Sequence, residues 1–420
     1  MSTDEQMPPV KFDVVVVGGG AAGVAAAVGA AQAGARVGLV ERHGYLGGAA
    51  VASSVLTYCG FFDHSHAQVV AGVGQRFLDR LDELDLYLTH TSAESGNKVV
   101  LLDLETTKRV FDSLVLDSGV TPLLHATVFG ATTVDGRVTA LDVAHPGGTL
   151  RLEAEAFVDG SGDGVLLDAA GAARTVVPAA HRQASTLVMR IGGVREDGDL
   201  SRAGMTSAVA GYRGATGVEL PRDHGVTVRL PVSREIMVLV ADQHRDVLDA
   251  AESTSAEIEG RRLAMHYFQA LRTGMRGWES SFLAATGPEL GVRETRRLAG
   301  LVAVTAGDVT NARRRPDVIA RGGWPMEDHA VPGVVSYGGI RDDSWYDIPY
   351  GSLTAASLGN LWAAGRLVSS DGRAYGSVRV MGTAFATGHA AGVAAALSVR
   401  SGPVAVGAVQ DELRRQGALL

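Results

Sequence analysis

A run of glycine and alanine between two apolar segments constrains this chain more than any other feature. Residues 12–17 include four consecutive valines and lead into a turn, residues 18–23, with the sequence Gly-Gly-Gly-Ala-Ala-Gly. An alanine- and valine-rich segment follows to about Gly34, and residues 36–40 form a second apolar run that ends at Glu41. Apolar, β-branched runs of this length are typical of buried parallel strands. The order predicts a strand, a tight turn, a helix and a second parallel strand.

The glycines of this turn fit the pattern G-x-G-x-x-G. Gly18 permits the turn, Gly20 lets backbone amides reach a pyrophosphate, and Gly23 lets helix and strand pack closely. The helix N-terminus adds positive dipole for the phosphates. Glu41 lies where a carboxylate accepts hydrogen bonds from ribose hydroxyls, and it would repel a 2′-phosphate, so FAD or NAD is favoured over NADP. The residues expected to bind the dinucleotide here are Gly18, Gly20, Ala21, Ala22, Gly23 and Glu41.

A second glycine-bearing loop directly after Glu41 favours FAD over NAD. It contains Arg42, Gly47, Gly48 and Ala49, whereas an NAD-binding domain normally continues here into its next helix and strand. At this point the sequence resembles the FAD-dependent oxidoreductases of the glutathione-reductase-like superfamily, in which such a loop wraps the extended FAD. The resemblance implies that these four residues contact FAD.

Three later segments extend the resemblance over nearly the whole chain. Residues 157–164 run from an apolar strand into a Gly- and Asp-rich turn, residues 360–366 form a short apolar run before another glycine turn, and residues 375–382 open a helix. In the family, that helix N-terminus faces the flavin pyrimidine, where its dipole stabilises negative charge on the reduced ring. Val128 stands where related proteins offer backbone to adenine, although a core valine explains it equally well. The further cofactor residues implied are Val128, Gly162, Asp163, Gly365, Arg366, Ser377, Val378, Arg379 and Gly382.

The expected fold class is α/β. We expect a Rossmann-like FAD-binding domain, a parallel sheet with a β-meander, in residues 1–57, 100–170 and 355–420, and an inserted mixed α+β substrate lobe in residues 58–99 and 171–354. A strand is predicted at residues 120–128, and the meander at residues 131–134, 137–144 and 149–156, with turns at 135–136 and 146–148. Helical periodicity predicts helices at residues 67–86, 104–117 and 251–272.

Charge and cysteine content exclude several classes. The net charge of −8 offers no basic field for nucleic acid or an anionic membrane. Cys59 is the only cysteine, which excludes an internal disulfide, the redox pair of disulfide reductases and any Cys-cluster metal site, and no metal is expected. Residues 1–6 are acidic and polar where a signal peptide would be basic and then apolar, so a cytoplasmic location is expected. The uncharged residues 14–35 fit a strand, turn and small-residue helix better than a membrane span.

Flavin chemistry requires few side chains, because a hydride moves to or from N5 and one group handles the proton. The candidates for catalysis are Tyr58, Cys59, His64, Tyr346 and Arg379, with His66, His329 and Arg373 as further possibilities. Cys59 and the histidines could instead anchor the flavin covalently. A buried hydrophobic role for Cys59 and a surface position for His64 are the competing interpretations.

The expected function is that of an FAD-dependent dehydrogenase or oxidase, which moves a hydride between a small metabolite and flavin N5 in specialised metabolism. Two alternatives stay open: a double-bond reductase fed by a separate electron donor, and a non-catalytic flavin-binding protein. The sequence is distantly similar to fumarate reductase flavoproteins, but it does not supply their full arginine and histidine set, and a second G-x-G-x-x-G unit for NAD(P)H is missing. Molecular oxygen or a separate electron carrier, and a homo-oligomeric state, are the partners left open.

Overall fold

The computed structural model describes residues 10–92 and 95–420, and its centre is a five-stranded parallel sheet. The strand order is β22 (Leu361–Ala363), β11 (Ala156–Asp159), β2 (Val14–Val17), β3 (Val37–Val40) and β7 (Thr121–Leu123). Together β2, α1 (Ala21–Gln32) and β3 confirm the predicted strand, turn, helix and strand. Residues 1–6, on which the cytoplasmic prediction rests, lie outside the described residues.

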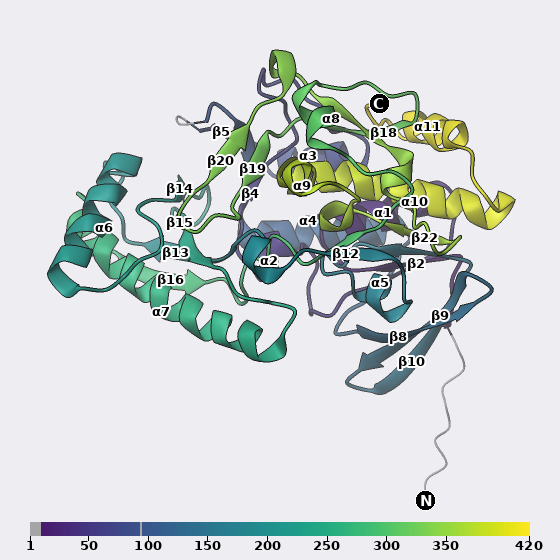
Figure 1. Ribbon diagram of the computed structural model, residues 1–420, viewed down its shortest axis with the longest axis horizontal. Helices are drawn as coiled ribbons and strands as arrows, with labels where there is room; N and C mark the ends of the chain where they lie inside the picture. Colours follow the sequence, from purple (N-terminus) through teal and green to yellow (C-terminus); the bar gives the residue numbers. More distant parts are fainter. Residues whose placement is uncertain (1–9, 93–94) are drawn as a thin grey trace, which may run out of the picture.

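Two helices made of small residues cross at the centre of the molecule (Figure 1). Helix α1 packs on α10 (Met381–Ser401), and both are almost entirely buried. A β-carbon at Gly388 would overlap the carbonyl oxygen of Ala22, and one at Gly392 would overlap that of Ala26. The two backbones are therefore in direct contact, which only glycine permits at these positions.

The β-meander comprises the antiparallel strands β8 (Thr127–Val134), β9 (Arg137–His145) and β10 (Gly148–Glu153), with β1 (Val10–Lys11) parallel to β10. The single strand predicted at residues 120–128 is wrong, because β7 ends at Leu123 and β8 begins at Thr127. Between them His125 has a φ of +54°, and the backbone N–H of Ala126 donates to the carbonyl oxygen of Glu41. This break turns the chain from the parallel sheet into the meander.

A second, antiparallel sheet has the order β14 (Val226–Arg229), β15 (Ile236–Gln243), β13 (Ser185–Gly192) and β16 (Phe282–Thr286). Its outer face packs on α6 (Arg202–Thr216) and α7 (Ala250–Gly274), on the left of Figure 1, away from the meander. Alternate side chains of β13, such as Leu187 and Met189, join that outer core. The intervening Thr186 and Val188 therefore face away from that outer core and line the main cavity of the molecule.

The helix predicted at residues 67–86 is shorter in the structure, where α3 spans Val73–Asp82. Gly72 precedes it with a φ of +61°, and the segment before that pairs through a bridge between Phe62 and Gln68. The predictions for α4 (Leu104–Asp117) and α7 are confirmed. The main hydrophobic core includes Val188 and Ile319 as well as α1 and α10, so residues assigned to both predicted domains share it. The division into two domains stays a prediction.

The single helix expected to open at residues 375–382 is two helices in the structure. Helix α9 (Gly372–Val378) ends before α10 begins at Met381, and the two axes are bent by 91°. Among the described residues no single helix is long and apolar enough to cross a membrane, although this bent pair would qualify by length and composition together.

The remaining elements of the described residues are α2 (Ala49–Ala52), β4 (Thr57–Tyr58), β5 (Leu88–Thr91), β6 (Lys98–Leu101), α5 (Val165–Ala169), β12 (Arg174–Val176), β17 (Arg296–Leu298), α8 (Ala306–Thr310), β18 (Val318–Gly322), β19 (Met326–Asp328), β20 (Ser336–Gly338), β21 (Tyr346–Pro349) and α11 (Val406–Arg415), with four short 3₁₀ turns.

The contact between α1 and α10 can be tested with a matched pair of glycine substitutions. Gly388→Ala should lower the free energy of unfolding by about 1–3 kcal/mol, because the added methyl group forces two backbones apart. Gly407→Ala lies in the exposed helix α11 with open space around it, and it should be neutral or stabilising by up to about 1 kcal/mol. The unfolding midpoints of the two variants in urea measure the difference. Equal midpoints would contradict the close backbone contact.

Candidate active site

A cavity of about 1440 Å³ begins at the carboxyl ends of β2, β3 and β11 and extends to the antiparallel sheet. The carboxyl ends of parallel strands are where ligands of α/β proteins bind. Most of the predicted cofactor residues line it, namely Gly18, Gly20, Ala21, Ala22, Glu41, Arg42, Gly48, Ala49, Val128, Gly162, Asp163, Gly365, Arg366 and Arg379. The structure therefore brings together residues from three widely separated parts of the chain.

The turn before α1 is shaped for a close ligand. Gly18 has a φ of +98°, and a β-carbon there would lie 2.5 Å from the Cα of Ser161, so a side chain cannot be accommodated. Gly20 is the N-cap of α1 and offers no side chain to cap the first turn. The backbone of Gly20, Ala21 and Ala22 borders the cavity at the positive end of the helix dipole. This geometry fits a pyrophosphate group.

The Glu41 carboxylate is fixed at the end of β3. It is 7 % exposed and accepts hydrogen bonds from the backbone N–H of Gly19 at 2.6 Å and that of His43 at 2.9 Å. Burial raises its pKa, but the hydrogen bonds from the ring and backbone of His43 and from Gly19 outweigh burial, and the net pKa lies below the ordinary value. Glu41 is therefore an ionised acceptor at the position expected for ribose recognition.

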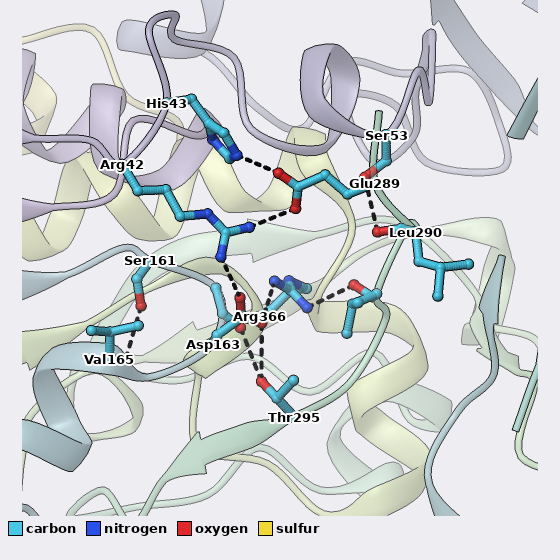
Figure 2. A network of polar contacts seen from close by, with 12 residues as sticks. Arg42, His43, Ser53, Ser161, Asp163, Val165, Glu289, Leu290, Thr295 and Arg366 are labelled. Atoms are coloured by element: carbon cyan, nitrogen blue, oxygen red, sulfur yellow. Dashed lines mark hydrogen bonds and ion pairs between the residues drawn. The ribbon is translucent and has the colours of Figure 1, made fainter. Parts of the chain in front are cut away.

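A polar network joins the nucleotide end of the cavity to the segment before β17 (Figure 2). His43 binds the carboxylate of Glu289, and Arg42 donates to the other oxygen of that carboxylate at 2.7 Å. Asp163 accepts a hydrogen bond from Arg366 at 2.9 Å and lies 4.0 Å from Arg42. Hydrogen bonds to Glu289 and Glu41 raise the pKa of His43 to about 9, so the imidazole is cationic at neutral pH.

At the other end of the cavity, Glu327 collects three donors. The indole N–H of Trp324 donates to Oε2 at 3.0 Å, while the ring Nε2 of His329 and the hydroxyl of Tyr337 contact Oε1 at 3.0 and 3.2 Å. The guanidinium of Arg379 reaches the carbonyl oxygen of Glu327 at 3.5 Å. All five side chains border the cavity.

The protonation states of Glu327 and His329 follow from these contacts. Burial raises the pKa of Glu327, but the hydrogen bond from His329, with Arg379 and Trp324, outweighs it and holds the pKa far below its usual range. Burial and the charge of Arg293 lower the pKa of His329 to about 4. His329 is thus neutral with Nε2–H donating to Glu327, and its Nδ1 is buried with no hydrogen-bond partner in the structure. A neutral imidazole in this tautomer offers Nδ1 as a proton acceptor.

Of the predicted catalytic residues, Cys59, His64 and Arg379 border the cavity. Burial raises the pKa of the Cys59 thiol, so it is protonated at neutral pH. Tyr58 lies outside the cavity lining in an aromatic cluster, and its ring is 5.3 Å from that of Phe77. Tyr346 also lies outside, because its hydroxyl bonds Ser377 at 2.8 Å within the core.

Five predicted cofactor residues stand behind the cavity wall rather than on it: Gly23, Gly47, Ser377, Val378 and Gly382. Ser377 donates to the carbonyl oxygen of Trp324 and thereby supports that loop. The backbone N–H of Gly382 donates to the carbonyl oxygen of Cys59 at 2.7 Å. The backbone of Gly47 donates to the carbonyl oxygen of Gly19, which ties the second loop to the first. These contacts give Ser377, Gly382 and Gly47 a supporting place, and a direct contact with FAD stays a prediction for all five residues.

Sequence reasoning missed most of the polar groups at the inner end of the cavity, the end that holds Glu327, including Arg222, Trp324, Glu327 and Tyr337. It also missed Glu289 at the nucleotide end. A signal for one of them was present, because Glu327 and His329 are two residues apart in and just after β19, and side chains at that spacing point to the same side of a strand. Glu289 and Arg222 lie in loops whose paths no local pattern specifies.

The parallel sheet and the glycine-lined cavity at its carboxyl edge define an α/β protein with a dinucleotide cradle. The family model described as FAD dependent oxidoreductase matches residues 13–413, so the chain belongs to the FAD-dependent oxidoreductase family. The protein is an oxidoreductase, and its cofactor is FAD.

Solved structures share the fold of this chain. A geranylgeranyl bacteriochlorophyll reductase-like protein from Thermoplasma acidophilum has 13 % identity and a TM-score of 0.51, over 97 % of this chain and 83 % of that chain. A p-nitrophenol 4-monooxygenase from Pseudomonas putida has 13 % identity and a TM-score of 0.50, over 97 % of this chain and 84 % of that chain. At this identity the likeness concerns the fold. No curated protein matches the sequence.

The position of Glu41 predicts its role in holding FAD. Glu41→Ala should weaken FAD binding by at least about tenfold, because ribose hydroxyls lose an ionised acceptor. Glu105→Ala removes an exposed carboxylate on α4 that pairs only with Lys108, and it should leave FAD binding unchanged. Fluorescence titration of the FAD-free protein with FAD compares the two. Equal dissociation constants would contradict the ribose assignment.

The bridge from Glu41 through His43 to Glu289 predicts a pH dependence. The folded-state pKa of His43 is about 9, above the ordinary 6.5, so its ion pairs stabilise the fold fully below pH 6.5. That stability should be lost as the pH rises through 9. Thermal unfolding of the FAD-loaded protein should show a midpoint that falls between pH 6.5 and 9.5, with a shallower fall for His43→Gln. Parallel curves for the two proteins would show that His43 does not carry this dependence.

Proposed function

We propose that this enzyme is a dehydrogenase or oxidase that moves a hydride from a small metabolite to FAD. The observation that carries the proposal is the neutral His329, oriented by Glu327 and placed in the same cavity as the FAD cradle. FAD, when bound, supplies the hydride acceptor at flavin N5. The chain must then bind the metabolite and take up its proton.

His329 is suited to accept that proton. Its Nδ1 has a free lone pair, and Nε2–H is held by a carboxylate that stabilises the imidazolium form once it appears. Trp324 and Tyr337 donate to Glu327 and keep that carboxylate from turning away from the ring. A histidine with one nitrogen bound to a carboxylate and the other free is a common arrangement for a general base.

The low pKa of His329 bears on the direction of the reaction. Because burial and the charge of Arg293 lower this pKa to about 4, the residue holds no proton to give to a substrate at neutral pH. This supports oxidation of the metabolite over the alternative of a double-bond reductase. The same proposal includes five further points. They are membership of the glutathione-reductase-like superfamily, similarity to fumarate reductase flavoproteins, oxygen or a separate carrier as the electron acceptor, a cytoplasmic location and a homo-oligomeric state.

His329→Gln should lower the rate of flavin reduction by about 10²–10⁴-fold while FAD remains bound. The experiment is anaerobic bleaching of the bound flavin with a panel of small metabolites, followed by stopped-flow measurement with those that react. His145→Gln, at the exposed end of β9 where the ring contacts the backbone N–H of Gly147, is the matched control and should react like the wild type.

The pH profile gives a second measurement on the same variants. The wild-type rate of flavin reduction should be independent of pH near neutrality and fall as the pH drops toward 4, where His329 becomes protonated. His329→Gln should lack this fall. A wild-type rate in His329→Gln, or flavin that no metabolite bleaches in a fully loaded protein, would overturn the proposed function.

A further inference from the structure

Two arginines at the inner end of the cavity share one carboxylate. Nη1 of Arg222 lies 3.1 Å from Oδ2 of Asp242, and Nη1 of Arg293 lies 3.9 Å from Oδ1. Arg293 also donates to the carbonyl oxygen of Ala184 at 2.7 Å and to the hydroxyl of Thr186 at 2.5 Å. Both arginines border the cavity, and Asp242 lies behind them, 5 % exposed.

The remaining charges at this end do not neutralise the pair. Arg379 and Glu327 offset each other, and His329 is neutral, as is His244, whose pKa burial lowers. The other acidic side chains that line the cavity, among the residues the structure describes, are Glu41, Asp163 and Glu289 at the nucleotide end and the exposed Asp343. Arg222, Arg293 and Arg379 against Asp242 and Glu327 therefore leave one positive charge within this group of five side chains. Such a site favours an anionic ligand, because an uncompensated buried charge is costly.

Arg222 is also incompletely satisfied and rigidly held. It is 7 % exposed, and its Nε is buried with no hydrogen-bond partner in the structure. Its backbone is fixed from both sides, because the Tyr267 hydroxyl accepts from its N–H at 2.8 Å and donates to its carbonyl oxygen at 3.0 Å. A ligand in the cavity would therefore meet a guanidinium group that Asp242 and the fixed backbone already hold in place.

The wall beside the two arginines is apolar. Val188 pairs in register with Leu239 across β13 and β15, next to the pair formed by Thr186 and Asp242. Val226 lies opposite Leu239 on β14. Val188, Leu239 and Val226 line the cavity, together with Leu290 and Ile340. A ligand with an anionic end at the arginines would place a hydrocarbon body against this wall.

We propose that the substrate is an apolar carboxylic acid, bound through its carboxylate between Arg293 and Arg222 and through its body against the wall formed by Val188, Leu239 and Val226. This inference rests on the proposed function and names the substrate class for the same site. The ionised end of the substrate then lies at the positive charge of the arginine pair that Asp242 does not balance. The reacting carbon lies on the side of His329 and the FAD cradle.

The test measures binding to the FAD-loaded enzyme by calorimetric titration, with benzoate and hexanoate as probes and benzamide and hexanamide as neutral isosteres. At least one acid should bind about tenfold or more tightly than its amide. Inorganic phosphate is the third probe and should not displace the acid at equal concentration. Equal binding of acids and amides, or displacement by phosphate, would overturn the carboxylic-acid class.

Two variants separate the charge from the fold. Arg293→Gln leaves the pair of Arg222 and Asp242 intact but removes the excess charge, and it should weaken binding of the acid by about tenfold or more. The double variant Arg222→Gln with Asp242→Asn removes one charge of each sign and should keep a preference for acid over amide. Arg262→Gln, an exposed arginine that pairs with Glu259 on α7, should bind as the wild type does. Preference lost in the double variant but kept in Arg293→Gln would overturn the inference.

The outcome is separable from that of the proposed function. Acid binding that depends on Arg293, in an enzyme whose flavin no metabolite bleaches, would count against the proposed oxidation and leave the ligand class standing. Bleaching that depends on His329, in an enzyme that does not distinguish acids from amides, would overturn the carboxylate inference alone.

Discussion

The site depends on the backbone contact between α1 and α10. Where Gly388 and Gly392 meet Ala22 and Ala26, no side chain separates the helices, and both helix N-termini reach the same cavity. A single added methyl group at this crossing would displace one N-terminus relative to the other. This contact lies outside the cavity. It fixes the spacing between the phosphate cradle at the start of α1 and the cavity-lining residues Val380 and Met381 at the start of α10.

A second close glycine contact lies near Glu327 and His329. A β-carbon at Gly376 on α9 would overlap the backbone of Glu327, so the helix lies directly against the strand that carries the carboxylate. The sequence predicts that Gly376 belongs to a flavin-facing helix, and the chain bends by 91° after α9, before α10 begins. Gly376 packs against the backbone of Glu327, and its place at the flavin stays a prediction.

The sequence was informative where function is carried by a local pattern. The turn from Gly18 to Gly23, the acid at Glu41 and the turn at Gly162 were predictable, because each is a backbone requirement with a fixed spacing. The break at His125 was not, since it depends on hydrogen bonds to residues 41 and 43 across the sheet. The inner end was largely hidden for the same reason. Arg222, Arg293 and Glu327 meet only after distant segments fold together, and arginine is common in this chain.

The segment between β16 and β17 links the two ends of the cavity. It carries Glu289, which pairs with Arg42 and His43, and four residues later Arg293, which faces the substrate end. Under the proposed roles, a nucleotide that orders Glu289 also restricts Arg293, because one short stretch of backbone joins the two residues. Linkage then requires reciprocity. The factor by which a bound nucleotide raises the affinity for the substrate equals the factor by which a bound substrate raises the affinity for the nucleotide. Under the proposed roles, loss of the cofactor would therefore weaken substrate binding by the same factor by which loss of the substrate weakens cofactor binding.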